Sequence, residues 1–410
     1  MDLLAAADAE LFERATLVFG LLLVAGALLS GLARRSFLSL TALFVLAGFA
    51  LGEGGAELVE FDPRSGFVST LAIVALIVIL FRDGLEVEAE VLQRSWRLPL
   101  RKLVLAMPVT AALVACATKA LTDLTWTEAF LVGALLSPTD PVLSSSVVTN
   151  PRVPRTVRHS LNLESGMNDG LALPAVLALA AAASTDGSDF TWWRFVLEDV
   201  SIGLATGALV GWAAAKLMPR TRALGAEISA HQKSLYALGV ALAAYGVATA
   251  SPEGNGLIAV FVCAIVLGIL RPDIRAAFEG GAEDLIEIVK LGVFLVFGAV
   301  LTADVLFEDG MAAVAIVAFT LLVARPAAVF LSLAGTGTDV PTRAFMSWFG
   351  PKGVATMTFA LLVLSESVEA GERIFGIAAL AVVVSIVAHG ATDHAGSEWM
   401  ARHAERTHAR

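Results

Sequence analysis

The chain has 410 residues, of which 57% are apolar and 16% are charged, and its mean hydropathy is +0.78. Soluble domains carry roughly 45–50% apolar and about 25% charged residues, so the composition excludes an ordinary soluble protein and predicts an all-α polytopic protein embedded in a lipid bilayer. The formal net charge of -10 argues against a nucleic-acid partner.

Thirteen segments are apolar and long enough to cross a membrane as helices. They are predicted at 15–33, 37–54, 65–82, 98–121, 126–148, 156–183, 192–217, 231–249, 254–270, 283–302, 310–334, 342–365 and 370–391. No connection between them is long enough for a soluble domain. We therefore expect a single membrane domain at 1–391 and a short tail at 392–410.

Lysine and arginine alternate between the connections of these spans. The odd-numbered connections are basic, and the even-numbered ones are poor in Lys and Arg. Because basic loops stay in the cytoplasm, this pattern predicts a multi-pass protein of the cell (inner) membrane with its C-terminus cytoplasmic and its N-terminus outside. A missed span would disturb the alternation, which supports the count of thirteen.

The fifth and twelfth predicted spans are both interrupted near their middle. One contains Ser-Pro-Thr-Asp-Pro at 137–141, and the other contains Gly-Pro-Lys-Gly at 350–353; neither sequence continues a helix comfortably. Each is the fifth member of a six-span set, and the two spans run in opposite directions. Matched broken helices in two inverted repeats indicate a transporter site. The alternative is two ordinary proline kinks, which are common in membrane helices.

Several polar residues are predicted at the depth of these breaks. Asp169 lies about 20 Å into the sixth span, near the bilayer centre, where an ionisable side chain is costly and usually functional. Ser165 shares its helix face, and the break at Thr139 frees carbonyl oxygens. These oxygens suit a small hard cation, so Asp169, Ser165 and Thr139 are candidate ligands of a monovalent cation. Asp140 and Asn168 are further candidates, or they only cap the broken half-helices.

A second pair of charges lies closer to the cytoplasmic side. Glu164 is predicted about 12 Å deep and Arg325 about 14 Å deep in their spans. Their matched depth and opposite charge predict a buried ion pair. Because each charge is costly to bury alone, we interpret this pair as structural rather than catalytic.

Four motifs resemble those of the sodium/proton exchanger family, in the branch with an Asn-Asp pair in its sixth span. They are Thr-Asp-Pro at 139–141, Glu-Ser-x-x-Asn-Asp at 164–169, Val-Ala-Arg-Pro at 323–326 and Gly-Pro-Lys-Gly at 350–353. The motifs follow the family's order and cover essentially the whole membrane part. The resemblance implies a secondary antiporter, not an enzyme, that exchanges a monovalent cation for H⁺ without a cofactor. Na⁺ is the favoured cation, with K⁺ or Li⁺ possible.

The same resemblance implies roles for the individual residues. Asp169 would carry the cation and the proton, and Ser165 and Thr139 would help to coordinate the cation. Asp140 and Asn168 would hold the broken half-helices together. The family also implies a homodimer, with a moving core at about 98–183 and 310–391 and a dimerisation scaffold at about 1–97 and 192–302. A single titrating carboxylate in the Asn-Asp pair predicts electroneutral exchange.

Two positions depart from the family's pattern. Lys352 stands where the family has an arginine, which keeps the charge but loses the fork geometry. The third span ends Phe-Arg-Asp at 81–83, where many relatives place an acid directly after the phenylalanine. The resemblance therefore does not carry a helper carboxylate in the ion path over to Arg82 or Asp83.

Two other functions compete with antiport. An intramembrane aspartyl protease would use Asp140 and Asp169 as a carboxylate pair, but its Tyr-Asp and Gly-x-Gly-Asp motifs are absent from the sequence. A cation channel or a non-transporting sensor could share the transporter fold, and obligate proton counterflow would distinguish a transporter from a channel. The sequence has no Gly-Lys-Ser/Thr nucleotide loop, so ATP-driven pumping is not expected.

Overall fold

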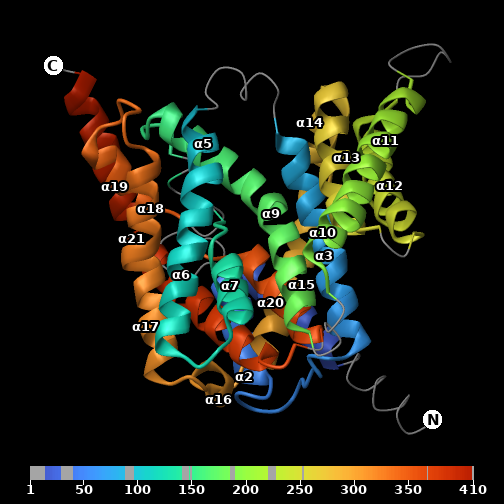
Figure 1. Ribbon diagram of the computed structural model, residues 1–410. Helices are drawn as coiled ribbons and strands as arrows, with labels where there is room; N and C mark the ends of the chain where they lie inside the picture. The colour runs from blue at the N-terminus through green and yellow to red at the C-terminus, as the bar shows by residue number, and fades with distance from the viewer. Residues whose placement is uncertain are drawn as a thin grey trace, which may run out of the picture.

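The computed structural model describes residues 14–28, 40–87, 97–140, 147, 150–184, 190–219, 228–251, 254–366 and 368–408. These residues are almost entirely helical (Figure 1). The helices are Arg14–Leu28, α2 (Leu40–Leu51), α3 (Gly66–Glu86), α5 (Arg97–Arg101), α6 (Met107–Leu121), α7 (Trp126–Leu136), α9 (Arg155–Ala183), α10 (Trp192–Phe195), α11 (Ser201–Leu217), α12 (Ala230–Thr249), α13 (Gly256–Leu270), α14 (Pro272–Gly281), α15 (Glu283–Val300), α16 (Ala303–Leu306), α17 (Met311–Phe319), α18 (Arg325–Ser332), α19 (Val340–Trp348), α20 (Val354–Ser365) and α21 (Gly371–His408).

Six of the described helices are long and apolar enough to cross a membrane. They span Gly66–Glu86, Leu98–Leu121, Arg155–Ala183, Trp192–Leu217, Met311–Ser332 and Gly371–Arg406. A seventh candidate is the pair α13 and α14, which is bent by 116°. Four apolar helices are shorter, and two of them, α7 and α20, end or begin at the predicted breaks. The expected all-helical membrane architecture is therefore confirmed.

Two of the long helices contain a π-helical turn next to a proline. Lys102–Ala106 joins α5 to α6, and Thr320–Ala324 joins α17 to α18. In each turn a backbone N–H bonds five residues back, from Met107 to Lys102 and from Arg325 to Thr320. A proline follows at the next position in both helices. Since proline lacks an N–H and its ring clashes with the carbonyl four residues earlier, the wider turn accommodates it.

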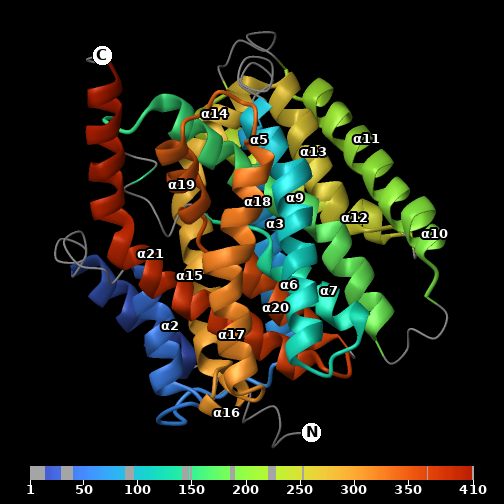
Figure 2. The same ribbon diagram turned by 60° about the vertical axis from the view of Figure 1, so that its left-hand side comes forward.

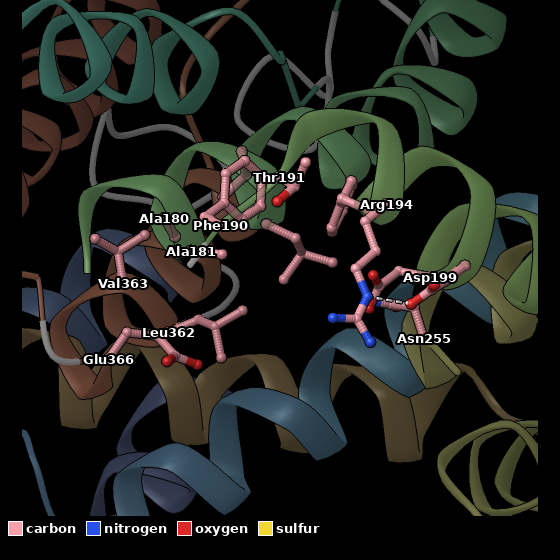
Figure 3. A pocket seen from close by; sticks show the side chains of 14 residues that line it. Ala180, Ala181, Phe190, Thr191, Arg194, Asp199, Asn255, Leu362, Val363 and Glu366 are labelled. Atoms are coloured by element: carbon pink, nitrogen blue, oxygen red, sulfur yellow. Dashed lines mark hydrogen bonds and ion pairs between the residues drawn. The ribbon is translucent and has the colours of Figure 1, made fainter. Parts of the chain in front are cut away.

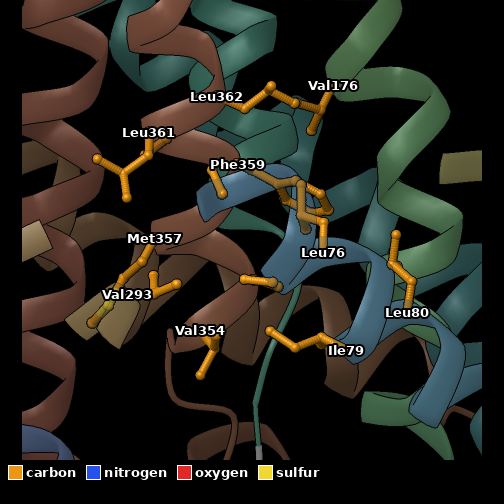
Figure 4. Packing of buried hydrophobic residues seen from close by; sticks show 14 of the residues in the cluster. Leu76, Ile79, Leu80, Val176, Val293, Val354, Met357, Phe359, Leu361 and Leu362 are labelled. Atoms are coloured by element: carbon orange, nitrogen blue, oxygen red, sulfur yellow. The ribbon is translucent and has the colours of Figure 1, made fainter. Parts of the chain in front are cut away.

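Four helices meet in the centre of the apolar core. Figure 4 shows Leu76 and Leu80 of α3 beside Val176 of α9, with Val293 of α15 and Phe359 of α20 in the same cluster. All five side chains are buried. Helices α3 and α20 therefore pack through the middle of the molecule, where they support the segment in which α19 gives way to α20.

Glycines allow several pairs of helices to approach closely, among them α3 with α13 and α2 with α15. Helix α3 packs on α13, where a Cβ on Gly84 would lie 2.8 Å from the carbonyl oxygen of Phe261. Helix α2 packs on α15, where a Cβ on Gly48 would lie 2.9 Å from the amide nitrogen of Ala299. Any larger residue at either position would push the helices apart. In a bilayer, such close contacts replace the hydrophobic driving force that water supplies elsewhere.

The last helix extends beyond its predicted end. The expected span ended at residue 391, with a short tail after it, but α21 continues without interruption to His408. Its final turns are packed: Met400 and Ala401 are buried, and Arg152 forms ion pairs with Glu398 at 3.0 Å and Glu405 at 3.1 Å. At 1.5 Å per residue the helix is about 57 Å long, well beyond a bilayer core of about 30 Å.

Candidate ion-binding site

The two predicted breaks lie against each other and satisfy each other's backbone. The amide of Asp140 donates to the carbonyl of Pro351 at 2.9 Å, and the Asp140 carboxylate accepts from the amide of Val354, the first residue of α20, at 3.2 Å. The ammonium of Lys352 donates to the carbonyl of Pro138, just beyond the end of α7, at 2.9 Å. An anion thus caps a helix N-terminus and a cation caps a helix C-terminus, in agreement with the helix dipoles.

This crossing requires a glycine at position 353. A Cβ there would lie 2.5 Å from the Cβ and the Oδ2 of Asp140, so any side chain would displace the carboxylate that caps α20. Lys352 itself is fully buried. The ammonium of Lys352 therefore caps the helix end at the opposite break, not a helix end in its own span.

Helix α21 holds the second break from behind. The amide of Lys352 donates to Ser385 Oγ at 2.8 Å, and Ser385 Oγ lies 3.0 Å from His389 Nδ1. His389 Nε2 lies 2.9 Å from the carbonyl oxygen of Trp348, the last residue of α19. His389 Nδ1 also lies 2.9 Å from the carbonyl oxygen of Ser385, so both ring nitrogens face a carbonyl acceptor. Sequence reasoning missed both α21 residues, whose only signal is their spacing of four in an apolar span.

Helix α9 holds the first break in a similar way. The side-chain amide of Asn168 donates to the carbonyl oxygen of Thr139 at 2.9 Å and to its hydroxyl oxygen at 3.0 Å. The structure thus brings Asn168 and Thr139 into direct contact, and Asn168 holds the segment that precedes Asp140. Ser165 is buried one helical turn before Asp169 on α9.

Two buried oxygens beside this contact lack a protein donor. Oδ1 of Asn168 and Oδ1 of Asp169 have no hydrogen-bond partner among the described residues. Buried polar atoms are normally paired, so these acceptors favour a ligand that brings positive charge or a proton. Within the same residues, no three His, Cys, Asp or Glu side chains converge as a multivalent metal site would require.

The predicted ion pair of Glu164 and Arg325 is present, and it has a third member. Glu164 Oε1 lies 3.2 Å from Arg325 Nη1, and its Oε2 lies 2.6 Å from Lys102 Nζ. All three side chains are buried. Lys102 lies inside the predicted span at 98–121, but the sequence did not identify it as a partner of Glu164. It begins the π-helical turn and is buried, and it also donates to the Ser160 carbonyl at 3.2 Å.

The end of α3 brings a further pair of charges to the site. Helix α3 continues past its predicted end to Glu86, and Asp83 on it is 2% exposed. Both Nε and Nη2 of Arg82 donate to Asp83 Oδ1, at 2.8 and 2.6 Å. This segment lies against α9, because a Cβ on Gly166 would lie 3.6 Å from the carbonyl oxygen of Asp83.

Two cavities lie along α9 on either side of Asp169. The first, of about 160 Å³, is lined by Asp83 and Glu86 of α3, by Glu279 of α14 and by the α9 segment that ends at Met167. The second, of about 410 Å³, begins at Val176 of α9 and is lined also by residues of α10, the following π-helical turn and α20. Figure 3 shows Arg194 and Asp199 on one side of this second cavity and Glu366 on the other.

Comparison with known proteins connects this geometry to a family. The family described as "Sodium/hydrogen exchanger, transmembrane" matches residues 20–394, which include both breaks and all of α9. The chain belongs to the sodium/hydrogen exchanger family. Members of this family are transporters and not enzymes, so the protein is a multi-pass membrane cation/proton antiporter.

Individual relatives show how far this exchanger resembles characterised members. It is 24% identical over 391 residues to the K(+)/H(+) antiporter NhaP2 of Shewanella oneidensis, which covers 94% of this chain and 67% of that protein. It is 26% identical over 396 residues to the K(+)/H(+) antiporter NhaP of Alkalimonas amylolytica, again covering 67% of the relative. The chain therefore spans about two thirds of the length of these relatives.

A solved structure supports the fold of the exchanger. The sodium proton antiporter MjNhaP1 of Methanocaldococcus jannaschii, at pH 8, superposes with a TM-score of 0.79 at 18% identity. The match covers 93% of this chain and 99% of that one. At this identity the likeness concerns the fold alone, which agrees with the sequence-based expectation of an exchanger architecture.

The buried group of Lys102, Glu164 and Arg325 predicts an ordered series of stabilities. Glu164→Gln leaves two cations unpaired and should destabilise the protein by about 3–5 kcal/mol. Lys102→Met should cost clearly less, because Glu164 and Arg325 still pair one to one. Thermal unfolding of the purified protein in detergent measures the order. Arg64→Met, which breaks the exposed pair with Glu372, is the control and should have little effect. A loss for Lys102→Met that equals the loss for Glu164→Gln would contradict the assignment.

Proposed function

We propose that this exchanger binds a monovalent cation and a proton alternately at Asp169. The observation that carries the proposal is the buried Asp169 Oδ1, which has no donor among the described residues and lies beside the crossed breaks. Burial disfavours an unpaired carboxylate, so Asp169 is neutralised either by a proton or by a cation. Competition between the two for one carboxylate couples their transport.

The remaining oxygens assign supporting roles. Ser165 and Thr139 provide hydroxyl and carbonyl oxygens near the carrier, as a small hard cation prefers. Asn168 and Asp140 hold the breaks in place, since Asn168 bonds Thr139 and Asp140 caps α20. Asn168 Oδ1 adds an unfilled acceptor next to Asp169. Lys352 remains a cap of α7 and does not enter the ion path.

We propose the thirteen-span, inverted-repeat arrangement for the whole chain. Matched features support it. The two π-helical turns that are followed by a proline occur in predicted spans 4 and 11, and the breaks occur in spans 5 and 12. Gly84 brings α3 and α13 together, which are spans 3 and 9. Gly48 brings α2 and α15 together, which are spans 2 and 10. Each of these features relates one span to the span seven positions away, 3 to 10 and 2 to 9 for the glycine contacts, as two repeats would.

The two cavities support alternating access between a core and a scaffold. Both lie where α9, from the proposed core at 98–183 and 310–391, faces helices of the proposed scaffold at 1–97 and 192–302. Asp169 is about 3 Å of helix rise from Met167 in the first cavity and about 10 Å from Val176 in the second. The site therefore faces the first cavity, on the side of α14 and the end of α21 (Figure 2). With the C-terminus cytoplasmic, this is the inward-facing state.

The substrate class that we propose is the alkali cations. The curated relatives are named for K⁺, and the similar structure is named for sodium. The oxygens near Asp169 suit either ion by type. We also propose that two copies of the protein form a homodimer through the scaffold, as the family resemblance implies.

Asp169→Asn should abolish cation-driven proton movement, because an amide neither titrates nor neutralises a cation. The measurement is the pH change inside proteoliposomes after addition of Na⁺, K⁺ or Li⁺. Asp304→Asn makes the same chemical change at an exposed position of α16 and should leave exchange unchanged. Wild-type-like exchange by a monodisperse Asp169→Asn protein would remove Asp169 from the role of carrier.

Exchange should be electroneutral, because one cation displaces one proton from one carboxylate, that of Asp169. Net charge movement would couple to voltage by about 2.3 kcal/mol per charge per 100 mV. The final ion gradient in proteoliposomes held at several membrane potentials tests this. The predicted gradient does not change with voltage. A systematic shift would require a second proton carrier.

A further inference from the structure

Arg82 is bonded to an acid that lines the first cavity. It lies at the end of α3, next to Asp83, which lines this cavity together with Gly166 and Met167 of α9. Its guanidinium holds Asp83 Oδ1 with two hydrogen bonds and lies 3.8 Å from Glu86, a second acid of the same cavity. The side chain of Arg82 is 24% exposed. The guanidinium is therefore a positive charge held against two acids that line the first cavity.

Helix α3, which carries Arg82 and Asp83, packs closely on two neighbouring helices. Helix α3 packs on α9, where a Cβ on Gly166 would lie 3.6 Å from the Asp83 carbonyl oxygen. Gly166 is one turn before Asp169. Helix α3 also packs closely on α13 at Gly84. These close backbone contacts hold the Arg82–Asp83 pair beside α9.

The cavity brings this pair of charges close to the helix that carries Asp169. Gly166 and Met167 of α9 line the cavity together with Asp83 and Glu86, and Asp169 follows Met167 by two residues. Arg82 is bonded to Asp83 and lies near Glu86. Asp140 and Lys290 are also buried, but Asp140 already caps α20.

We propose that Arg82 is a specificity-determining residue that acts as a tethered cation. It neutralises Asp83 and reduces the negative potential at Asp169, and it thereby weakens binding of the transported cation from the first cavity. The inference rests on the proposed function, because it requires Asp169 to be the carrier. Since α3 belongs to the proposed scaffold and α9 to the core, the effect is confined to the state in which Asp169 faces this cavity.

The test is the half-saturating concentration of Na⁺, K⁺ and Li⁺ for exchange in proteoliposomes oriented with the first cavity accessible. Arg82→Gln should lower this concentration about five- to tenfold for a unit charge removed at short range. The assay is run at alkaline pH. Removing the positive charge also strengthens proton binding at Asp169, so at lower pH bound protons would mask the change in cation affinity. At acidic pH the difference from wild type should shrink. A merely structural role for Arg82 predicts no such dependence.

Matched variants separate charge from shape. Arg82→Lys retains the charge and should stay close to wild type, as should Arg64→Gln, which removes an arginine distant in sequence from the first cavity. Asp83→Asn leaves the guanidinium without its acid and should raise the half-saturating concentration about fivefold. The double variant Arg82→Gln, Asp83→Asn removes both charges and should return close to wild type.

The outcomes distinguish this inference from the proposed function. If Asp169→Asn is inactive but Arg82→Gln and Asp83→Asn both bind cations within twofold of wild type, the tethered-cation role is overturned and the antiport assignment stands. If Asp169→Asn still exchanges, the antiport site itself is wrong. If Arg82→Gln does not remain monodisperse, Asp83→Asn is the deciding variant. The proposal is overturned if the half-saturating cation concentration of Asp83→Asn does not rise.

Discussion

Backbone that leaves the helix in the interior of a membrane protein must find partners within the protein, because lipid offers none. In this exchanger the two breaks are each other's partners. Asp140 caps the start of α20 and Lys352 caps the end of α7, so each buried charge is stabilised by the helix end of the opposite break. Asn168 of α9 and the Ser385–His389 pair of α21 then fix the two crossing segments to long helices on either side. The position of Asp169 follows from this arrangement, since it is the neighbour of Asn168.

The charges around the crossing are divided between fixed and exchangeable groups. Glu164 is matched by Lys102 and Arg325, and Asp83 is matched by Arg82. Asp169 Oδ1 is the carboxylate oxygen that stays buried without a donor among the described residues. Because a buried carboxylate is stable only when it is neutralised, the absence of a permanent protein partner is what allows proton and cation to replace each other. A fixed partner at Asp169 would make the site a structural ion pair.

The sequence predicted the helical membrane fold, both breaks and the Glu164–Arg325 contact, because hydropathy, proline and charge depth are local signals. It could not predict partners that depend on how helices cross. Lys102 lies near the start of its predicted span, and its contact with Glu164 depends on how α9 packs against the π-helical turn before Pro108. Lys352 lies in the break of its own span, but its ammonium reaches the other break, which no local signal predicts. Ser385 and His389 lie in an apolar span without a motif, and α21 continues past 391 because its last turns pack on the protein.

The most direct test of competition at one carboxylate is proton release on cation binding. Purified protein in weakly buffered detergent solution is titrated with Na⁺, K⁺ or Li⁺ at a pH where the carrier is protonated, and the released protons are counted. The account predicts one proton per chain at saturation with the transported cation, and none from Asp169→Asn. Saturable cation binding without proton release, or release that persists in Asp169→Asn, would contradict it.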